Sequence, residues 1–255
     1  MFKIKKLSNP KLKNPILIEG LPGMGNVGKI TVDFMVESLK AEKFMEIKSE
    51  VFPNSVFVNE ENLVELPKIE LYYKNTKKHS LVLLCGDIQP LEEKSCHAFC
   101  EKILDIFQEL GGTEIVTIGG IGLPSIPEKP RVFVTGNDKK LIKKYRSSNT
   151  NEKIYGVVGP IIGVSGLLLG LSKERKIPAI SFLAETFGHP SYLGLKGAKK
   201  VILTLNNLFS IKVDTKGLDR EIKEMSIEEK NISNEIKKFS NKIPFRKEPG
   251  MNYIG

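Results

Sequence analysis

The sequence of 255 residues contains no tryptophan and only three cysteines. An odd number of cysteines cannot form a closed set of disulfides, so we expect a reduced, cytoplasmic protein. Without tryptophan, and without aromatic residues interleaved among basic ones, the sequence does not favour a nucleic-acid partner. No apolar segment typical of a signal peptide opens the chain. The longest uncharged stretch, residues 155–172, is interrupted by five glycines and a proline, so we expect no membrane span.

The net charge of +9 includes five lysines that precede the first acidic residue, Glu19. A basic arm of this kind can bind nucleic acid or anionic lipid. Residues 1–7, however, alternate apolar and basic side chains, which more simply predicts an edge strand whose lysines block pairing with another sheet. We therefore predict neither a nucleic-acid nor a membrane partner.

Two of the cysteines, Cys96 and Cys100, lie four residues apart with His97 between them, a spacing that suggests a metal site. On a helix they also share a face with Ile103 and Phe107, as small buried hydrophobic residues do. No fourth ligand is apparent in the sequence. We predict no metal and no cofactor.

Apolar runs alternate with helical patterns over most of the chain. Three runs, 80–85, 113–118 and 178–184, are apolar on both faces, which is typical of strands covered by helices on each side. The alternation predicts a three-layer α/β/α sandwich. Strands are expected at 15–19, 44–51, 55–58, 69–73, 80–85, 113–118, 131–135, 154–158 and 178–184, and helices at 26–41, 91–110, 138–146, 161–175 and 191–209.

The character of the sequence changes after about residue 210. From residue 215 onward, apolar residues recur in a heptad-like stripe on an otherwise charged helical pattern. We predict an α/β domain over 1–210, a helical extension over 211–245 and a flexible tail over 246–255. The stripe can be buried on its own domain or in an oligomer contact, and the sequence does not distinguish between the two.

The strand expected at 15–19 leads directly into a glycine-rich turn and a helix. Gly23, Gly25 and Gly28 follow the spacing G-x-G-x-x-G, which in dinucleotide enzymes lets the backbone approach a pyrophosphate at a helix N-terminus. The alternative is that these glycines only make a tight turn and let the helix and the strand pack closely.

Three polar residues, Asp87, Glu185 and His189, follow other strands, at the edge where open α/β sheets bind ligands. They can act as acid and base, or they can simply cap helices and turns. The sequence has no nucleophile elbow, no Walker lysine and no HExxH motif. We assign no catalytic residue, and we group these three residues with the three glycines of the turn as a ligand loop to be tested.

Four further glycines, Gly159, Gly163, Gly166 and Gly170, have the spacing of one helical face. Glycine weakens a helix by about 1 kcal/mol relative to alanine. Four glycines on one face therefore predict the close approach of another backbone.

Five segments, taken together, resemble the proteasome assembly chaperone 2 family, particularly its archaeal members. The segments are GLPGMGNVG (20–28), GDIQP (86–90), GGIGLP (119–124), GPIIGVSGLLLG (159–170) and ETFGHPSYLG (185–194). The resemblance covers residues 1–210, with the elements in the expected order. It implies an α/β fold like that of nucleoside phosphorylases and a homo-oligomeric protein, and no established catalytic activity follows from it.

The resemblance also implies a partner, because some members help to assemble the 20S proteasome α ring or dock on it. Docking is associated with a flexible C-terminal motif of a hydrophobic residue, a penultimate tyrosine and any last residue. Here Tyr253 is third from the end and Asn252 precedes it. We expect Tyr253 and Ile254 to contact the partner, and Ile232 and Ile236 to lie in an oligomer contact.

The leading hypothesis is a non-enzymatic, homo-oligomeric proteasome-assembly-chaperone-like protein that binds proteasome α subunits or a related partner. The alternative is a nucleoside- or phosphate-binding enzyme that uses the glycine-rich loops at the strand ends.

Overall fold

The structure is a computed structural model that describes residues 1–147, 149–154, 156 and 159–225. The chain divides into two compact units, Met1–Thr215 and Lys216–Gly255. The described part of the second unit, residues 216–225, is helical. The four residues that we expect to contact partners all lie outside the described residues: Ile232, Ile236, Tyr253 and Ile254.

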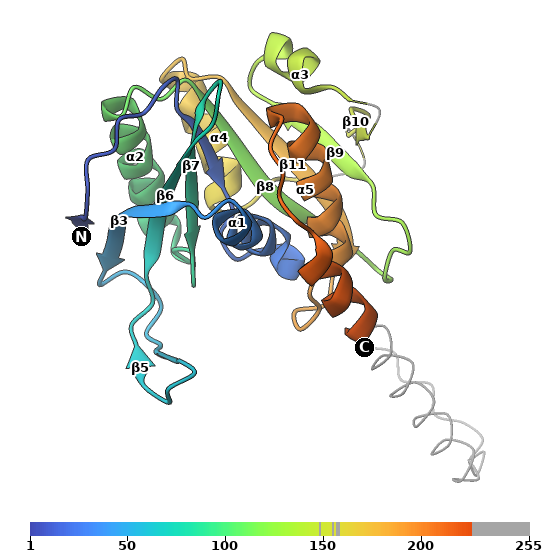
Figure 1. Ribbon diagram of the computed structural model, residues 1–255, viewed down its shortest axis with the longest axis horizontal. Helices are drawn as coiled ribbons and strands as arrows, with labels where there is room; N and C mark the ends of the chain where they lie inside the picture. The colour runs from blue at the N-terminus through green and yellow to red at the C-terminus, as the bar shows by residue number, and fades with distance from the viewer. Residues whose placement is uncertain (148, 155, 157–158, 226–255) are drawn as a thin grey trace, which may run out of the picture. The chain divides into compact units, whose positions relative to one another are not determined.

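The described part of the first unit is built around one mixed sheet of nine strands (Figure 1). In order across the sheet, the strands are β1 (Phe2–Lys6), β3 (Glu42–Ser49), β6 (Ile69–Asn75), β7 (Ser80–Gly86), β2 (Ile16–Glu19), β8 (Glu114–Leu123), β11 (Ala179–Phe187), β9 (Val132–Gly136) and β10 (Thr150–Asn151). β2 pairs in parallel with β7 and β8, and β11 pairs in parallel with β8. The carboxyl ends of these four strands therefore share one edge of the sheet.

Helices cover both faces of the sheet, which gives three layers (Figure 1). They are α1 (Val27–Ser38), α2 (Glu93–Glu109), α3 (Lys139–Tyr145), α4 (Val164–Glu174) and α5 (Leu195–Phe209). α1 packs beside α5, and α2 packs beside α4. Every residue of β2 and of β7 is buried, as strands covered on both faces must be. The predicted α/β class, with a large sheet between helices, is confirmed.

The core between the sheet and the α2–α4 layer contains both cysteines of α2. Cys96 and Cys100 are buried on the same helix face as Ile103 and Phe107, so the prediction of small buried hydrophobic residues is confirmed. Within the described ranges, no helix is long and apolar enough to cross a membrane, and no group of three or more His, Cys, Asp or Glu side chains is placed to hold a metal ion.

The N-terminal strand β1 lies at one end of the sheet and pairs with β3. Phe2 and Ile4 are half-buried, whereas Lys3 and Lys5 are exposed. The alternation of apolar and basic residues therefore places the lysines in water along an edge strand, as predicted.

Two regions differ from the strands expected from the sequence. The segment expected at 55–58 is β4 (Phe57–Val58), which forms a separate two-stranded sheet with β5 (Val64–Glu65). The strand expected at 154–158 lies partly outside the described residues, and its described residues, 154 and 156, are not in a strand. The nearest strand, β10, ends at Asn151, before the expected segment begins. There Asn151 Oδ1 accepts a hydrogen bond from the backbone N–H of Lys153 at 2.9 Å, which turns the chain.

Within the described part of the chain, no strand or second helix closely approaches the glycine stripe. α4 begins at Val164, so Gly159 precedes the helix, and Gly163 caps it with φ of +80°. A Cβ added at Gly159 or at Gly170 would meet no atom within 4 Å. At Gly166 it would meet the carbonyl oxygen of Ile161, in the loop that leads into the helix. Gly163 and Gly166 therefore shape the start of α4, whereas Gly159 and Gly170 meet no other element of the described chain.

Candidate functional site

The glycine-rich turn joins β2 to α1 through a short 3-10 helix, η1 (Met24–Asn26). Gly25 has φ of +60°, and a Cβ added there would lie 2.5 Å from Thr186 Oγ1. The carbonyl oxygen of Gly25 accepts a hydrogen bond from the backbone N–H of Gly194 at 2.7 Å. The turn is therefore pressed against the end of β11 and the start of α5, and this contact accounts for the glycine at position 25.

Gly28 is also explained by packing. A Cβ at Gly28 would lie 2.5 Å from the carbonyl oxygen of Ile118 in β8, and a Cβ at Gly20 would lie 2.2 Å from the carbonyl oxygen of Gly28. Close contact of α1 with β2 and β8 requires both positions to lack a side chain. Gly23, by contrast, is exposed, and an added Cβ would meet nothing within 4 Å.

A pocket of about 280 Å³ opens beside this turn, at the carboxyl ends of β2 and β8. It is lined by Leu21, Pro22, Gly23, Met24, Gly28, Gln89, Ile118, Gly119, Gly120, Pro160, Ile161, Ile162, Gly163, Ser165 and Leu183. Of the six residues in the predicted ligand loop, Gly23 and Gly28 line the pocket, whereas the other four do not. The described lining contains no lysine or arginine.

Gln89 connects two of the loops that surround this pocket. Its side-chain nitrogen donates a hydrogen bond to the carbonyl oxygen of Pro22 at 2.6 Å, and its side-chain oxygen accepts one from the backbone N–H of Val164 at 3.2 Å. Gln89 therefore ties the glycine-rich turn to the first turn of α4, where backbone N–H groups otherwise lack partners.

A buried carboxyl group lies behind the pocket. Glu19, the last residue of β2, has no exposed surface, and its carboxylate accepts hydrogen bonds from Ser165 Oγ at 2.8 Å and from the backbone N–H of Leu21 at 3.1 Å. Burial raises the pKa of Glu19 to about 7, although both hydrogen bonds act in the opposite direction. Sequence analysis missed this residue, yet a single acid inside the apolar run PILIEGL is a signal that could have marked it.

Glu185 is occupied by a structural ion pair. Its carboxylate accepts hydrogen bonds from the backbone N–H of Arg131 and from Nε of the same residue, each at 2.8 Å. Burial alone would raise the pKa of Glu185, but the hydrogen bonds and the charge of Arg131 outweigh it and hold the pKa below its ordinary value. The pair connects the end of β11 to the start of β9.

The other two predicted polar residues also have local partners. Asp87 accepts a hydrogen bond from the backbone N–H of Lys68 at 3.3 Å. The ring of His189 stacks on Phe187 with 5.8 Å between centroids, and its Nδ1 accepts a hydrogen bond from the backbone N–H of Ser191 at 3.3 Å. Each of the three residues thus has its own local partner, and none of them lines the 280 Å³ pocket.

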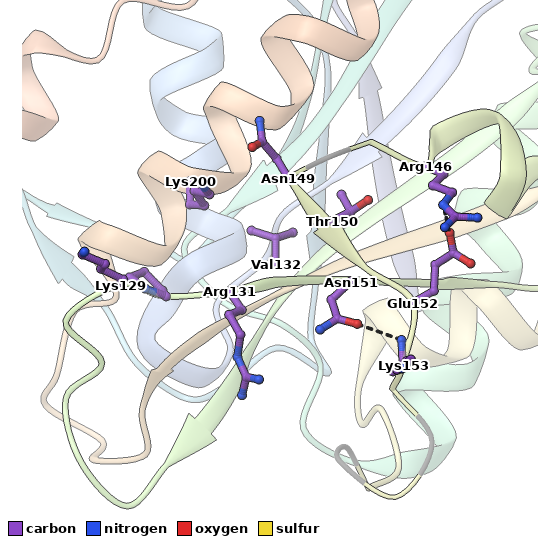
Figure 2. Close-up of a pocket in the computed structure, with 11 residues that line it drawn as sticks. Lys129, Arg131, Val132, Arg146, Asn149, Thr150, Asn151, Glu152, Lys153 and Lys200 are labelled. Carbon is purple, nitrogen blue, oxygen red and sulfur yellow. Dashed lines mark hydrogen bonds and ion pairs between the residues drawn. The ribbon is translucent and has the colours of Figure 1, made fainter.

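A second hollow, of about 560 Å³, is basic (Figure 2). It is lined by Lys129, Pro130, Arg131, Val132, Arg146, Asn149, Thr150, Asn151, Glu152, Lys153 and Lys200. Arg131 is paired with Glu185, and Arg146 lies 2.9 Å from Glu152. Among the described residues, the other three cations of the lining form no ion pair, so the hollow carries a net positive charge that can hold an anionic group.

The fold and this geometry can now be set beside known proteins. The model of the PAC2 family matches residues 17–232. The chain belongs to the PAC2 family. This match confirms the family that the five sequence segments indicate. Four of those segments supply residues to the 280 Å³ pocket, and the fifth, 185–194, packs on the glycine-rich turn through Thr186 and Gly194.

Three proteins similar to this chain show how far the similarity extends. An uncharacterized protein of Methanocaldococcus jannaschii is 32% identical over 249 residues, which cover 95% of this chain and 93% of that protein. PbaB of Pyrococcus furiosus, described as an archaeal proteasome activator, is 32% identical to this chain, with a TM-score of 0.83. The match covers 91% of this chain and 98% of PbaB.

PbaA of Pyrococcus furiosus is described as an archaeal homolog of proteasome-assembly chaperone. It is 21% identical, with a TM-score of 0.75 and coverage of 94% of this chain and 95% of its own. At this identity the match shows a shared fold alone.

Proposed function

We propose that this PAC2 protein is a non-enzymatic, cytoplasmic, homo-oligomeric chaperone that binds proteasome α subunits. The observation that carries the proposal is the similarity to PbaB, the archaeal proteasome activator, over 91% of this chain. In this account the α/β unit is a rigid scaffold, the segment around Ile232 and Ile236 contacts other copies, and Tyr253 with Ile254 engages the α subunits.

The geometry of the strand ends supports a scaffold. Gly25 and Gly28 are explained by close packing, and Glu185 is held by Arg131. Asp87, Glu185 and His189 each have a local partner, and none of the three lines the 280 Å³ pocket. The bridge that Gln89 makes between the glycine-rich turn and α4 holds these segments in place, as a scaffold role would use.

The alternative function, nucleoside or phosphate binding by an enzyme, is less well supported. A phosphate site requires cations or several free backbone N–H groups. The described lining of the 280 Å³ pocket has no cation, and the buried carboxyl of Glu19 lies directly behind Ser165. The pocket therefore suits a small uncharged ligand better than a phosphate.

Co-purification tests the proposal. The tagged full-length chain is mixed with the proteasome α subunits of its own source organism, and with an unrelated ring-forming protein as control. The proposal expects retention of the α subunits only. In parallel, a thermal-shift screen with nucleosides, nucleotides and phosphate is expected to leave the melting temperature unchanged, because the proposal includes no such ligand. The screen would detect one, since a ligand at 100 times its dissociation constant adds about 2.7 kcal/mol to the free energy of unfolding. A ligand-induced shift without retention of α subunits would favour the enzyme.

A further inference from the structure

The hairpin formed by β4 and β5 projects from the end of the sheet (Figure 1). Val58 and Val64 are direct cross-strand partners. Val56 directly precedes β4 and Leu66 directly follows β5, and each is two residues from a member of that pair, so extended chain places all four side chains on one face of the hairpin. These four side chains, the hairpin face below, are 53, 66, 68 and 66% exposed for Val56, Val58, Val64 and Leu66. The hairpin forms a sheet of its own outside the main sheet, and so much clustered apolar surface on it marks an interaction site.

The hairpin face continues into a hollow at the base of the hairpin. The apolar part of this hollow of about 640 Å³ is lined by Val56 and Leu66 of the face itself and by Phe52, Pro53 and Pro67, and polar and charged residues complete the lining: Lys3, Lys48, Ser49, Glu50, Asn54 and Ser55. One copy of the chain thus carries an apolar projection and, directly beside it, a concavity with an apolar part of matching chemistry. Such a surface is self-complementary under a two-fold axis, because each projection then fills the other copy's concavity.

The charges on the hairpin and around the hollow also favour a second copy of this chain as the partner. The tip of the hairpin carries Glu60 and Glu61, which form no ion pair within the described chain. The rim of the hollow carries Lys3 and Lys48, which are cross-strand partners in β1 and β3. Lys48 Nζ also lies 3.0 Å from Glu46 Oε1, so Lys3 is the less committed of the two cations. The rim also includes Glu50, whose carboxylate lies 3.5 Å from the amino group of Met1. When two hairpins pack face to face and antiparallel, the acidic tip of each copy reaches the basic rim of the other.

The hairpin is also preformed for such a contact. Asn59 Oδ1 accepts hydrogen bonds from the backbone N–H groups of Glu61 and Leu63 at 3.0 and 2.9 Å, which fixes the tip. On the face opposite the four aliphatic residues, Glu65 is held by Asn59 at 2.9 Å and by Lys68 at 3.0 Å. Little ordering is then needed when the partner binds.

We propose that the hairpin face and its hollow are a contact between two copies of this chain, with the hairpin of each copy seated in the hollow of the other. The proposal rests on the homo-oligomeric state proposed above and assigns it a surface. It is independent of binding to α subunits, because self-association is measured without them.

The first test substitutes Val64→Glu in the full-length chain and measures self-association by sedimentation velocity over a concentration series. Leu91→Glu is the matched control, because Leu91 is 79% exposed and lies outside the hairpin. We expect the Val64→Glu substitution to raise the dissociation constant roughly tenfold or more, since it buries an unpaired charge, and Leu91→Glu to leave it unchanged. Unchanged association of the Val64→Glu variant would overturn the proposal.

A charge exchange keeps the test independent of hairpin folding. One variant carries Glu60→Lys with Glu61→Lys, and the other carries Lys3→Glu with Lys48→Glu. Each variant alone is expected to associate more weakly than the parent, whereas an equimolar mixture regains association, because lysine tips then meet glutamate rims and glutamate tips meet lysine rims. A mixture as weak as its components contradicts the proposal. So does a parent chain that stays monomeric while Val64→Glu abolishes α-subunit binding, which would assign the hairpin to the other protein.

Discussion

The hydroxyl of Ser165 donates a 2.8 Å hydrogen bond to the buried carboxylate of Glu19, across 146 positions of sequence. This bond joins the end of the central strand β2 to the first turn of α4. Both residues lie where PAC2 segments converge, and Ser165 reaches the 280 Å³ pocket. A titratable group at this junction makes the stability of the scaffold depend on pH.

The first prediction concerns that dependence. The pKa of Glu19 is raised from the ordinary 4.5 to about 7, so between these values the folded chain holds a proton that the unfolded chain has released. Its contribution to stability is present in full below pH 4.5 and is lost as the pH rises through 7, by about 3 kcal/mol. Glu19→Gln removes this loss. Urea unfolding at pH 5 and pH 8, which bracket the raised pKa of about 7, measures the free energy of unfolding of the variant and of the parent. We expect Glu19→Gln to gain stability relative to the parent at the higher pH compared with the lower. The same stability difference at both pH values would contradict the assignment.

The second prediction concerns the glycine-rich turn. Gly25→Ala forces a side chain into φ of +60° and against Thr186, so we expect a loss of roughly 1–3 kcal/mol in the free energy of unfolding. Gly23→Ala is the control, because Gly23 has extended backbone angles and open space around it. Thermal unfolding of both variants measures the difference. Equal melting temperatures would show that the turn is not packed as described.

The third prediction concerns the ion pair between the exposed guanidinium of Arg131 and the buried carboxylate of Glu185. Arg131→Met leaves Glu185 as a buried carboxylate with one backbone hydrogen bond, which should cost roughly 2 kcal/mol. Because the pKa of Glu185 is held below its ordinary value, the stability from this pair is present above that ordinary value and lost as the pH falls. Arg146→Met, which breaks the exposed pair with Glu152, should cost less than about 1 kcal/mol. Similar losses in denaturant unfolding for the two variants would refute the distinction.

The fourth prediction concerns the heptad-like stripe. Ile232→Asp combined with Ile236→Asp should yield smaller species in sedimentation while the α/β unit keeps its melting temperature. An unchanged mass with a lower melting temperature would instead mean that the stripe packs within its own chain.

The fifth prediction concerns the C-terminal residues. Deletion of Asn252–Gly255 should weaken binding to α subunits without changing the oligomer or the melting temperature, because Tyr253 and Ile254 are the sizeable apolar residues at that end. If the truncated chain binds as tightly as the parent, the α subunits must contact the folded units.

The central strands could be predicted from the sequence because their chemistry is local. β7 and the first part of β8 are continuous apolar runs, and burial on both faces imposes such runs directly. The short hairpin strands were harder, since Val58 and Val64 pair with each other and not with the main sheet. The hairpin's exposed apolar residues give the same local pattern as a buried strand.

The pocket could be predicted only in outline. Gly23 and Gly28 line the pocket. The sequence indicates this position because glycines that follow a strand mark the carboxyl edge of the sheet. The contacts of Glu19 with Ser165, and of Glu185 with Arg131, were not predicted, because each pair joins segments that the strand order brings together from distant positions. Asp87 follows β7 and Glu185 ends β11, and β2 and β8 lie between these strands, so the shared edge did not bring the two acids together.

The most direct test of the account is sedimentation velocity of the full-length chain mixed with cognate proteasome α subunits. The account predicts a complex that sediments faster than either component and that forms without any added nucleotide. Separate sedimentation of the two proteins at every ratio, together with a thermal shift by a nucleoside or phosphate, would contradict it.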